Sequence, residues 1–297
     1  MFTTLVAVIA ALVLGHVAPA TVASLRRFSW FSHWLEWLGA QSAQRGLLAG
    51  RYGIALALLP PVLLVLAVQL ALKAPWFGLP GLLFGLLVLI YAWGPRDLDV
   101  DVEAVLDALD PQSRRERLLR LAPEPGVEVV EGPSAAEAVV RSGLRRWFGV
   151  LFWFLLLGPA GALLYRLSER AVVAQAMPAL GFEAQAGARR WLQWMEWPVA
   201  QLMTLTLALA GNFDVVFRAW RGAGGDRWTP DAAFLGAAAR AAVSGELAEE
   251  LADDLRDGLV PVLGDLAELR DAMSLVWRML LLWLALLALL IIAGWVH

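Results

Sequence analysis

The chain has 297 residues, of which 60% are hydrophobic and 17% are charged, and its formal net charge is −3. Soluble domains are about 45–50% apolar and about 25% charged, so this composition, with a mean hydropathy of +0.64, indicates a membrane protein. The lack of cysteine excludes disulfides, thiol catalysis and cysteine-bound zinc, and the acidic balance gives no footprint for nucleic acid.

The first apolar segment, residues 1–22, carries no charge. It ends in Ala18-Pro19-Ala20, which imitates a signal-peptidase site. However, no Lys or Arg precedes its apolar core, as signal peptides normally require. We therefore interpret it as a retained membrane helix.

Residues 28–40 carry apolar side chains at helical spacing, including Phe31, Trp34 and Leu38, with charges on other faces. This pattern favours an amphipathic helix lying in the membrane interface, and the alternative is a connecting loop.

Two further spans complete the region 1–95. The first, Tyr52 to Leu72, contains Pro60-Pro61, which predicts a kink. The second, Trp76 to Trp93, contains Gly81 and Gly85, a spacing that permits close helix packing.

Residues 96–146 are predicted to form a helical soluble loop. Short helices are expected over 97–109 and 111–121, the second of them capped by Asp110. Ser134 and Glu137 have the spacing of a capping box, which predicts a helix beginning near residue 134.

Residues 147–216 are predicted to form the central membrane region. Phe148 to Tyr165 carries no charge and is long enough to cross a hydrocarbon core of about 30 Å as one helix. Residues 188–197 have the pattern of a second interfacial helix. Pro198 then begins a span to about Phe213, and the sequence leaves open whether 188–213 crosses fully or is re-entrant.

A second helical soluble loop is expected over 217–276, followed by a membrane helix in 277–297. Thr229-Pro230 is expected to cap a helix, and a charged helix is expected over 246–257. Glu250 and Asp253 lie three apart, a spacing that suits either a divalent cation or, more commonly, a solvated helix face.

The fold class is therefore all-α: a polytopic helical membrane protein with about five to six membrane-spanning helices, interfacial helices and two helical soluble loops. The loops after the odd-numbered spans hold 18 Lys or Arg and those after the even-numbered spans hold 5. Positive charge marks the cytoplasmic side, so both large loops are predicted to be cytoplasmic and both termini periplasmic, in a bacterial inner membrane.

No phosphate-binding, nucleophile-elbow or zinc-protease motif is present, and the three histidines have no ligand spacing. We therefore predict no metal, no cofactor and no catalytic residues. The sequence leaves homo-oligomerisation open.

The candidate ligand site combines a small-residue turn in the central span with cations near one end of it. Its residues are Gly158, Pro159, Gly161, Tyr165, Arg166, Arg189 and Arg190. Buried polar groups at membrane depth often mark function, so we expect an anionic small molecule or cell-wall fragment there. The alternative is that Pro159 only kinks the helix and that the arginines bind ordinary lipid phosphates.

Several stretches resemble a known family. They are Glu131 with Ala136-Glu137, Leu151-Phe152-Trp153, Gly158-Pro159-Ala160-Gly161-Ala162 with Tyr165-Arg166, Ala188-Arg189 with Pro198, Gly211-Asn212-Phe213, and Leu263-Gly264-Asp265 with Arg270-Asp271-Ala272. This pattern is similar to the CbiB/CobD cobalamin-biosynthesis membrane proteins, a superfamily that includes the AmpE proteins. The layout of short spans and two soluble loops is closer to AmpE.

The chain departs from the cobalamin synthases at polar positions. Of their acidic pattern before the central span only Glu137 remains, and Ser168-Glu169-Arg170-Ala171 replaces their Asn-Thr-Leu-Asp. The resemblance therefore implies an AmpE-like regulatory or sensory inner-membrane protein linked to β-lactamase induction and cell-wall recycling, without an assigned enzymatic activity. The alternative is a divergent adenosylcobinamide-phosphate synthase, which joins a corrinoid carboxylate to an aminopropanol-type amine.

Overall fold

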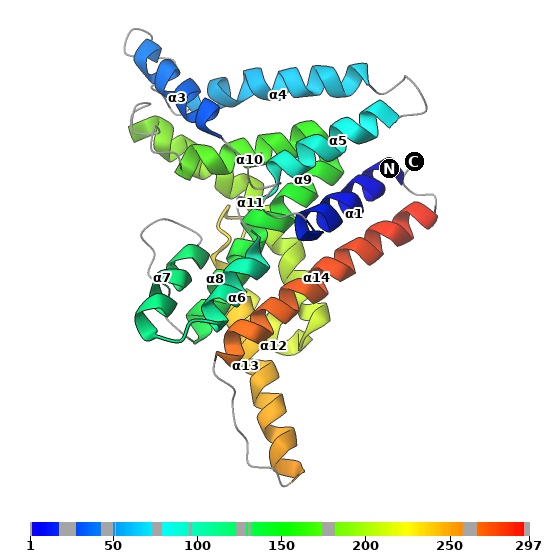
Figure 1. Ribbon diagram of the computed structural model, residues 1–297. Coiled ribbons are helices and arrows are strands. Elements are labelled where there is room, and N and C mark those ends of the chain that lie inside the picture. Colours follow the sequence, from blue (N-terminus) through cyan, green and yellow to red (C-terminus); the bar gives the residue numbers. More distant parts are fainter. Residues whose placement is uncertain are drawn as a thin grey trace. The chain divides into compact units, whose positions relative to one another are not determined.

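The computed structural model describes residues 2–17, 28–42, 50, 52–72, 79–94, 97–122, 129, 132–173, 182–257 and 266–293. These residues form helices and connections and contain no strand, which confirms the predicted all-α class (Figure 1). The helices are α1 (Phe2–Val17), α3 (Ser29–Ser42), α4 (Gly53–Ala71), α5 (Leu79–Ala92), α6 (Leu98–Leu106), α7 (Pro111–Leu121), α8 (Pro133–Gly143), the π-helix η2 (Leu144–Phe148), α9 (Gly149–Leu157), α10 (Pro159–Val173), α11 (Phe182–Ala210), α12 (Phe213–Gly222), α13 (Ala233–Arg256) and α14 (Ala267–Ile292).

Two helices of the described part, α4 and α14, are long and apolar enough to cross a membrane, by length and composition. Their most apolar 18-residue windows have mean hydropathies of 2.5 and 2.6, and only 17% and 28% of those windows are buried. On α4, Leu59, Leu63 and Leu64 are exposed. Exposed leucines on this scale are unusual for a soluble protein and are expected where a helix faces lipid.

The chain divides into two compact units. The first contains residues 1–95, 149–195 and 288–297, and the second contains residues 96–148 and 196–287. In the first unit α10 packs against α4, α5 and α9, and α1 packs against α5 (Figure 1). Its core joins α3, α4, α10 and α11 through buried side chains that include Phe31, Leu35, Ile54, Leu163 and Leu167.

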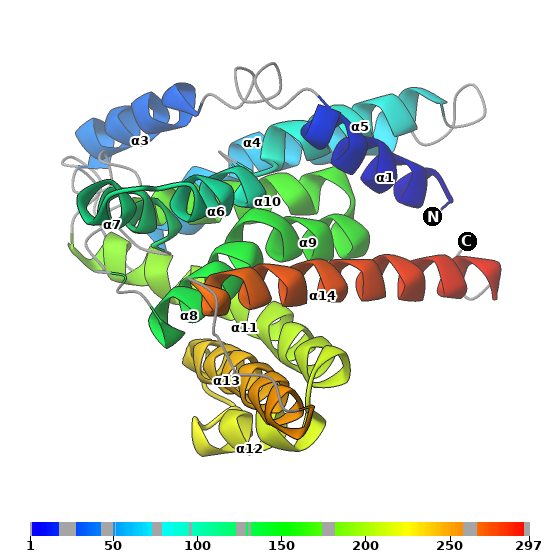
Figure 2. The same ribbon diagram turned by 60° about the horizontal axis from the view of Figure 1, so that its bottom comes forward.

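In the second unit α13 packs against both α8 and α12, and α6 packs against α7 (Figure 2). Aromatic pairs tie α14 to the π-helix: Trp147 and Trp277 have ring centroids 5.3 Å apart, and Phe148 and Trp283 are 5.0 Å apart. Edge-on pairs of this kind stabilise a helix contact beyond the area they bury.

Of the three predicted helix starts, those near residues 111 and 134 are confirmed and the one after Thr229-Pro230 is wrong. The Asp110 carboxylate accepts a hydrogen bond from the Ser113 N–H at 2.8 Å and caps α7. This hydrogen bonding from Ser113, together with weaker contributions from Gln112 and Arg117, holds the pKa of Asp110 below its ordinary value.

Helix α8 begins at Pro133, within one residue of the predicted start, but its N-cap is Gly132 and not Ser134. Gly132 has a φ of 95°, which glycine adopts at little cost. By contrast, α13 begins at Ala233 rather than directly after Thr229-Pro230, and the Asp231 carboxylate accepts from the Ala233 N–H at 2.9 Å.

Two proline-containing segments are continuous helices. The expected interfacial helix 188–197 and the span beginning at Pro198 are one 29-residue helix, α11, with Pro198 inside it. Similarly, α4 continues through Pro60 and Pro61. The helix expected over 28–40 is observed as α3, and its place in a membrane interface stays a prediction. Ala18-Pro19-Ala20, Glu131 and Leu263-Gly264-Asp265 lie outside the described residues.

Candidate functional site

The central apolar stretch is a helical hairpin and not the single span that its hydropathy predicts. α9 ends at Leu157, Gly158 adopts a φ of 73°, and α10 begins at Pro159. In one straight helix Gly149 and Tyr165 would lie about 24 Å apart. Here the two helices pack side by side, and a Cβ on Gly149 would collide with the Tyr165 ring.

Glycine and proline make this turn possible for separate reasons. A positive φ costs glycine little, whereas other residues are strained there. Pro159 stands at the first helical position, where the missing N–H would have had no helical partner. Gly161 is needed because a Cβ there would collide with the Trp153 carbonyl and crowd the Leu157 side chain. These three small or rigid residues therefore form the hairpin itself.

Gln69 of α4 closes the turn with both ends of its amide. Its Nε2 donates to the Leu157 carbonyl at 3.1 Å, and its Oε1 accepts from the Ala160 N–H at 3.1 Å. Leu157 ends one helix and Ala160 lies in the first turn of the next, so both backbone groups lack helical partners. One side chain thus satisfies a C-terminal acceptor and an N-terminal donor. Sequence analysis did not single out Gln69, although a lone Gln in an apolar helix is a usable signal.

Arg166 is fully buried and bound on two sides. Its Nε donates to the Ala92 carbonyl at 2.5 Å, and its Nη1 donates to Glu169 Oε2 at 3.2 Å. Ala92 is the last residue of α5, so its carbonyl lies at the negative end of that helix. The guanidinium therefore joins α10 to the end of α5 and is neutralised by a carboxylate one turn along its own helix.

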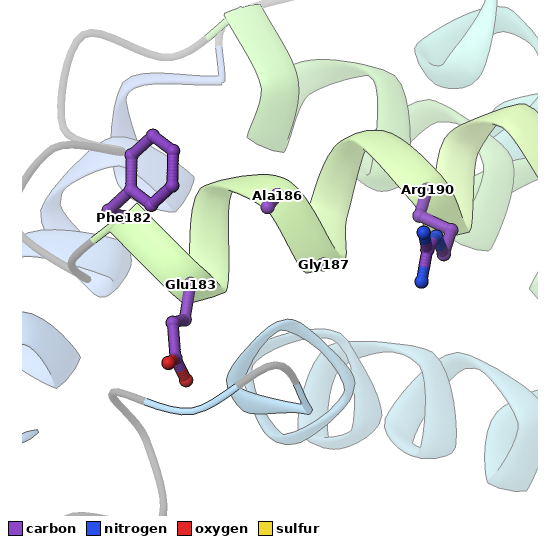
Figure 3. A pocket seen from close by; sticks show the side chains of 5 residues that line it. All are labelled: Phe182, Glu183, Ala186, Gly187 and Arg190. Carbon is purple, nitrogen blue, oxygen red and sulfur yellow. The ribbon is translucent and has the colours of Figure 1, made fainter.

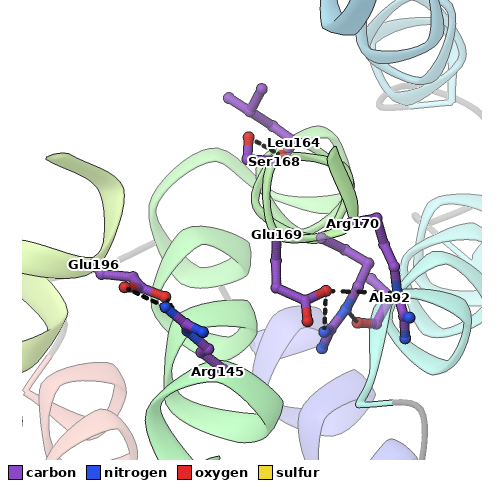
Figure 4. Close-up of polar contacts among 8 residues, drawn as sticks. Ala92, Arg145, Leu164, Ser168, Glu169, Arg170 and Glu196 are labelled. Carbon is purple, nitrogen blue, oxygen red and sulfur yellow. Dashed lines mark hydrogen bonds and ion pairs between the residues drawn. The ribbon is translucent and has the colours of Figure 1, made fainter. Parts of the chain in front are cut away.

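The residues that follow Arg166 extend this polar cluster along α10. Arg170 Nε lies 3.5 Å from Glu169 Oε2, and its guanidinium stacks over the Phe28 ring at 5.1 Å. The Ser168 hydroxyl donates to the Leu164 carbonyl at 2.7 Å (Figure 4) and accepts from Trp191 Nε1 at 3.0 Å. The segment Ser168–Arg170, which departs from the synthase pattern, therefore holds helices together.

The seven predicted site residues fall into three places. Gly158, Pro159 and Gly161 form the hairpin turn, while Arg166 and Tyr165 are buried about two turns further along α10. Arg189 and Arg190 are exposed on α11.

Arg190 lines a pocket of about 310 Å³ together with Phe182, Glu183, Ala186 and Gly187. Figure 3 shows the Glu183 and Arg190 side chains extending from the same side of α11. This pocket combines one cation, one anion and an apolar floor. Arg190 is therefore accessible from this pocket, whereas Arg166 is enclosed.

A second set of ion pairs lies in the other unit, around Glu137. The Glu137 carboxylate pairs with Arg141 at 3.3 Å and with Arg240 of α13. Gly236 lets the two helices approach this closely, since a Cβ there would collide with the Glu137 side chain. The Arg141 and Arg240 side chains remain 30% and 43% exposed. Two cations around one carboxylate leave a local net charge of +1 that solvent can reach.

The π-helix carries two further pairs of the same unit. Arg145 contacts Glu196 through two bonds, Nε to Oε1 at 2.7 Å and Nη2 to Oε2 at 3.4 Å (Figure 4). Arg146 donates to Asp101 at 2.6 Å and to the Arg120 carbonyl at 2.8 Å. The sequence pattern alone assigns no role to either arginine. Their partners are too distant in sequence for spacing to reveal them.

Within the described residues, no group of three or more His, Asp or Glu side chains could hold a metal ion. Asp253, considered above with Glu250, pairs with Arg256 at 3.0 Å on an exposed face of α13.

The chain is 31% identical over 207 residues to a protein of Chromobacterium violaceum named "Cobalamin biosynthesis protein CobD". The match covers 65% of this chain and 62% of that relative, so the chain spans less than two thirds of the relative's length. No family model matches, and no solved structure matches. The comparison supports the resemblance to the CbiB/CobD proteins and does not single out AmpE.

Proposed function

We propose that the chain is a multi-pass inner-membrane protein of the CbiB/CobD superfamily. Three observations support this: the similarity to CobD, the two helices able to span a membrane, and the apolar hairpin of α9 and α10. The distribution of Lys and Arg along the chain supports cytoplasmic placement of residues 96–146 and 217–276, with periplasmic termini.

We propose further that the chain acts in cobalamin biosynthesis, joining a corrinoid carboxylate to an aminopropanol-type amine. The observation that carries this is the 31% identity to CobD over 65% of the chain. The exposed arginines around Glu137 suit it chemically, because a carboxylate substrate is an anion and this cluster has a net charge of +1. Arg240 is the more exposed of the two and is the group we expect to meet the substrate.

A second function, AmpE-like regulation linked to β-lactamase induction and cell-wall recycling, is favoured by a different observation. Arg166 and Glu169, at and just after the family's central motif, are enclosed in contacts within α10 and with the end of α5. Side chains that are engaged in internal contacts stabilise the fold, which favours a protein that senses its ligand or partner at another place. The pocket beside Arg190 is the candidate place for an anionic ligand such as a cell-wall fragment.

Complementation separates the two functions. The chain is expressed in a bacterial strain that lacks its cobalamin synthase and needs cobalamin to grow. Synthase activity predicts growth without added cobalamin, and it predicts that Arg240→Gln slows growth while Arg256→Gln, a surface control on the same helix, does not. Failure of the wild type to restore growth, at normal membrane abundance, would favour the regulatory function. A β-lactamase induction assay in a strain lacking AmpE then tests that function directly.

A further inference from the structure

Helix α12 has one strongly apolar face that its own unit covers only in part. Phe213, Val216, Phe217 and Trp220 recur at helical spacing, whereas Asp214, Arg218 and Arg221 occupy a separate, exposed face. Val216 is buried, but Phe213 and Phe217 remain 49% and 44% exposed. A short helix with aromatic residues on one face and arginines on another has the pattern of helices that lie in a membrane interface.

The aromatic side chains of this face form a continuous ladder. The Phe213 and Phe217 rings are stacked with centroids 5.8 Å apart, and the Phe217 and Trp220 centroids are 5.3 Å apart. The ladder begins at the first turn, because the Asn212 side chain accepts from the Val215 N–H and fixes the start of the helix. The apolar face is therefore an ordered surface.

A groove of about 310 Å³ lies between this ladder and the C-terminal half of α11, which faces it with Leu202, Leu205 and Ala208. We name it the α11–α12 groove. Leu202 and Leu205 are 40% and 52% exposed. Such a volume is at the lower end of the range for small-ligand sites, about 300–1,000 Å³, and its walls are apolar.

A set of hydrogen bonds lies at one end of the groove. Trp220 Nε1 donates to Gln201 Oε1 at 2.9 Å, and Gln201 Nε2 donates to the Gly225 carbonyl at 2.8 Å. Gly225 lies directly against the Trp220 indole, where a Cβ would collide with it. These contacts hold α12 beside α11 at the end of the groove that Gln201 and Trp220 line.

We propose that the α11–α12 groove binds the acyl chain of an anionic phospholipid of the cytoplasmic leaflet. The groove is apolar, and Leu209, which follows Leu202 and Leu205 at helical spacing on α11, is also exposed. Arg218 and Arg221 stand exposed on the neighbouring face of α12, where they are placed to meet a phosphate headgroup. The apolar groove and the cationic face together match the two halves of one lipid.

Site-directed spin labelling of the full chain tests the placement of α12. Because the chain contains no cysteine, one nitroxide is attached at a time, through Phe217→Cys or Arg218→Cys, in vesicles of phosphatidylglycerol and phosphatidylcholine. The label at 217 should be accessible to oxygen and protected from a water-soluble nickel chelate, and the label at 218 should show the reverse. Equal access of the chelate to both labels would overturn the proposal, as would exclusion of both reagents at 217, which indicates a protein partner.

Photo-crosslinking tests the occupant of the groove. A benzophenone attached through Leu205→Cys should form an adduct with the mass of a phospholipid. Replacing Arg218 and Arg221 by Gln should lower the ratio of phosphatidylglycerol to phosphatidylcholine adducts by about fivefold or more, since each cation near an anionic surface contributes about 1 kcal/mol. An adduct with another protein chain, no adduct, or an unchanged lipid ratio would each contradict the proposal. Each variant is first checked for a monodisperse profile.

Discussion

The Gln69 contact with the hairpin turn gives the sharpest stability prediction. Gln69→Met keeps the length of the side chain but removes its hydrogen bonds to the Leu157 carbonyl and the Ala160 N–H. Interhelical hydrogen bonds in membranes contribute about 0.6 kcal/mol each on average and at most about 1.7. Losing two should therefore lower the free energy of unfolding by about 1–3 kcal/mol.

The measurement is reversible unfolding in mixed micelles, followed by circular dichroism, with the exposed neighbour Leu70→Met as the matched control. A double-mutant cycle sharpens it, because a Cβ at Gly158 would meet Gln69 Nε2 at 2.6 Å. Gly158→Ala should therefore be less harmful in a Gln69→Ala background, where only the strain of a positive φ, about 1–2 kcal/mol, remains. Strictly additive effects, or a Gln69→Met variant as stable as the control, would refute the reasoning.

Four further predictions follow from other contacts. Gly149→Ala should destabilise the protein by about 1–3 kcal/mol in the same unfolding assay because the buried Tyr165 ring blocks a Cβ, whereas Gly222→Ala, with open space around it, should change stability by about 0.5 kcal/mol at most. The pKa of Asp110 is lowered in the folded protein, so the stabilisation that its carboxylate provides is present above the ordinary pKa of 3.8 and is lost as the pH falls through the lower pKa of the folded state. Asp110→Asn should therefore flatten the acid side of the profile of stability against pH, and an unchanged profile would show that this cap does not cause the acid dependence. Arg190→Gln should abolish any cellular phenotype that depends on the anionic ligand while the protein keeps its normal abundance in the membrane, and full activity of this variant would exclude the pocket as the ligand site. Alkaline phosphatase fused at residue 125 should be inactive, and high activity would reverse the topology.

The hairpin shows why hydropathy alone misled the sequence analysis. An uncharged run of this length suits a membrane span, but hydropathy does not distinguish one long helix from two short helices packed together. The local signal was present, since a glycine just past one helix followed by proline at the next first position is a helix end and a helix start. Giving Gly158-Pro159 that interpretation would have predicted the turn.

Helix boundaries set by a local hydrogen bond were predictable, and those set by packing were not. Asp110 and Pro111 act within one turn, so the start of α7 followed from the sequence. Pro198 suggested a break, yet α11 continues through it as one helix. The same limit applied to the site: the Arg145–Glu196 pair joins residues 51 apart, and only the fold brings them together.

The most direct test of the central proposal is the corrinoid product itself. Cells lacking their cobalamin synthase, but expressing this chain, are supplied with an isotope-labelled aminopropanol-type amine, and their corrinoids are measured by mass spectrometry. The CobD-type function predicts a corrinoid amide that carries the label and that is absent from cells with an empty vector. Accumulation of the free corrinoid carboxylate without labelled amide, with the chain at normal abundance in the membrane, would contradict it.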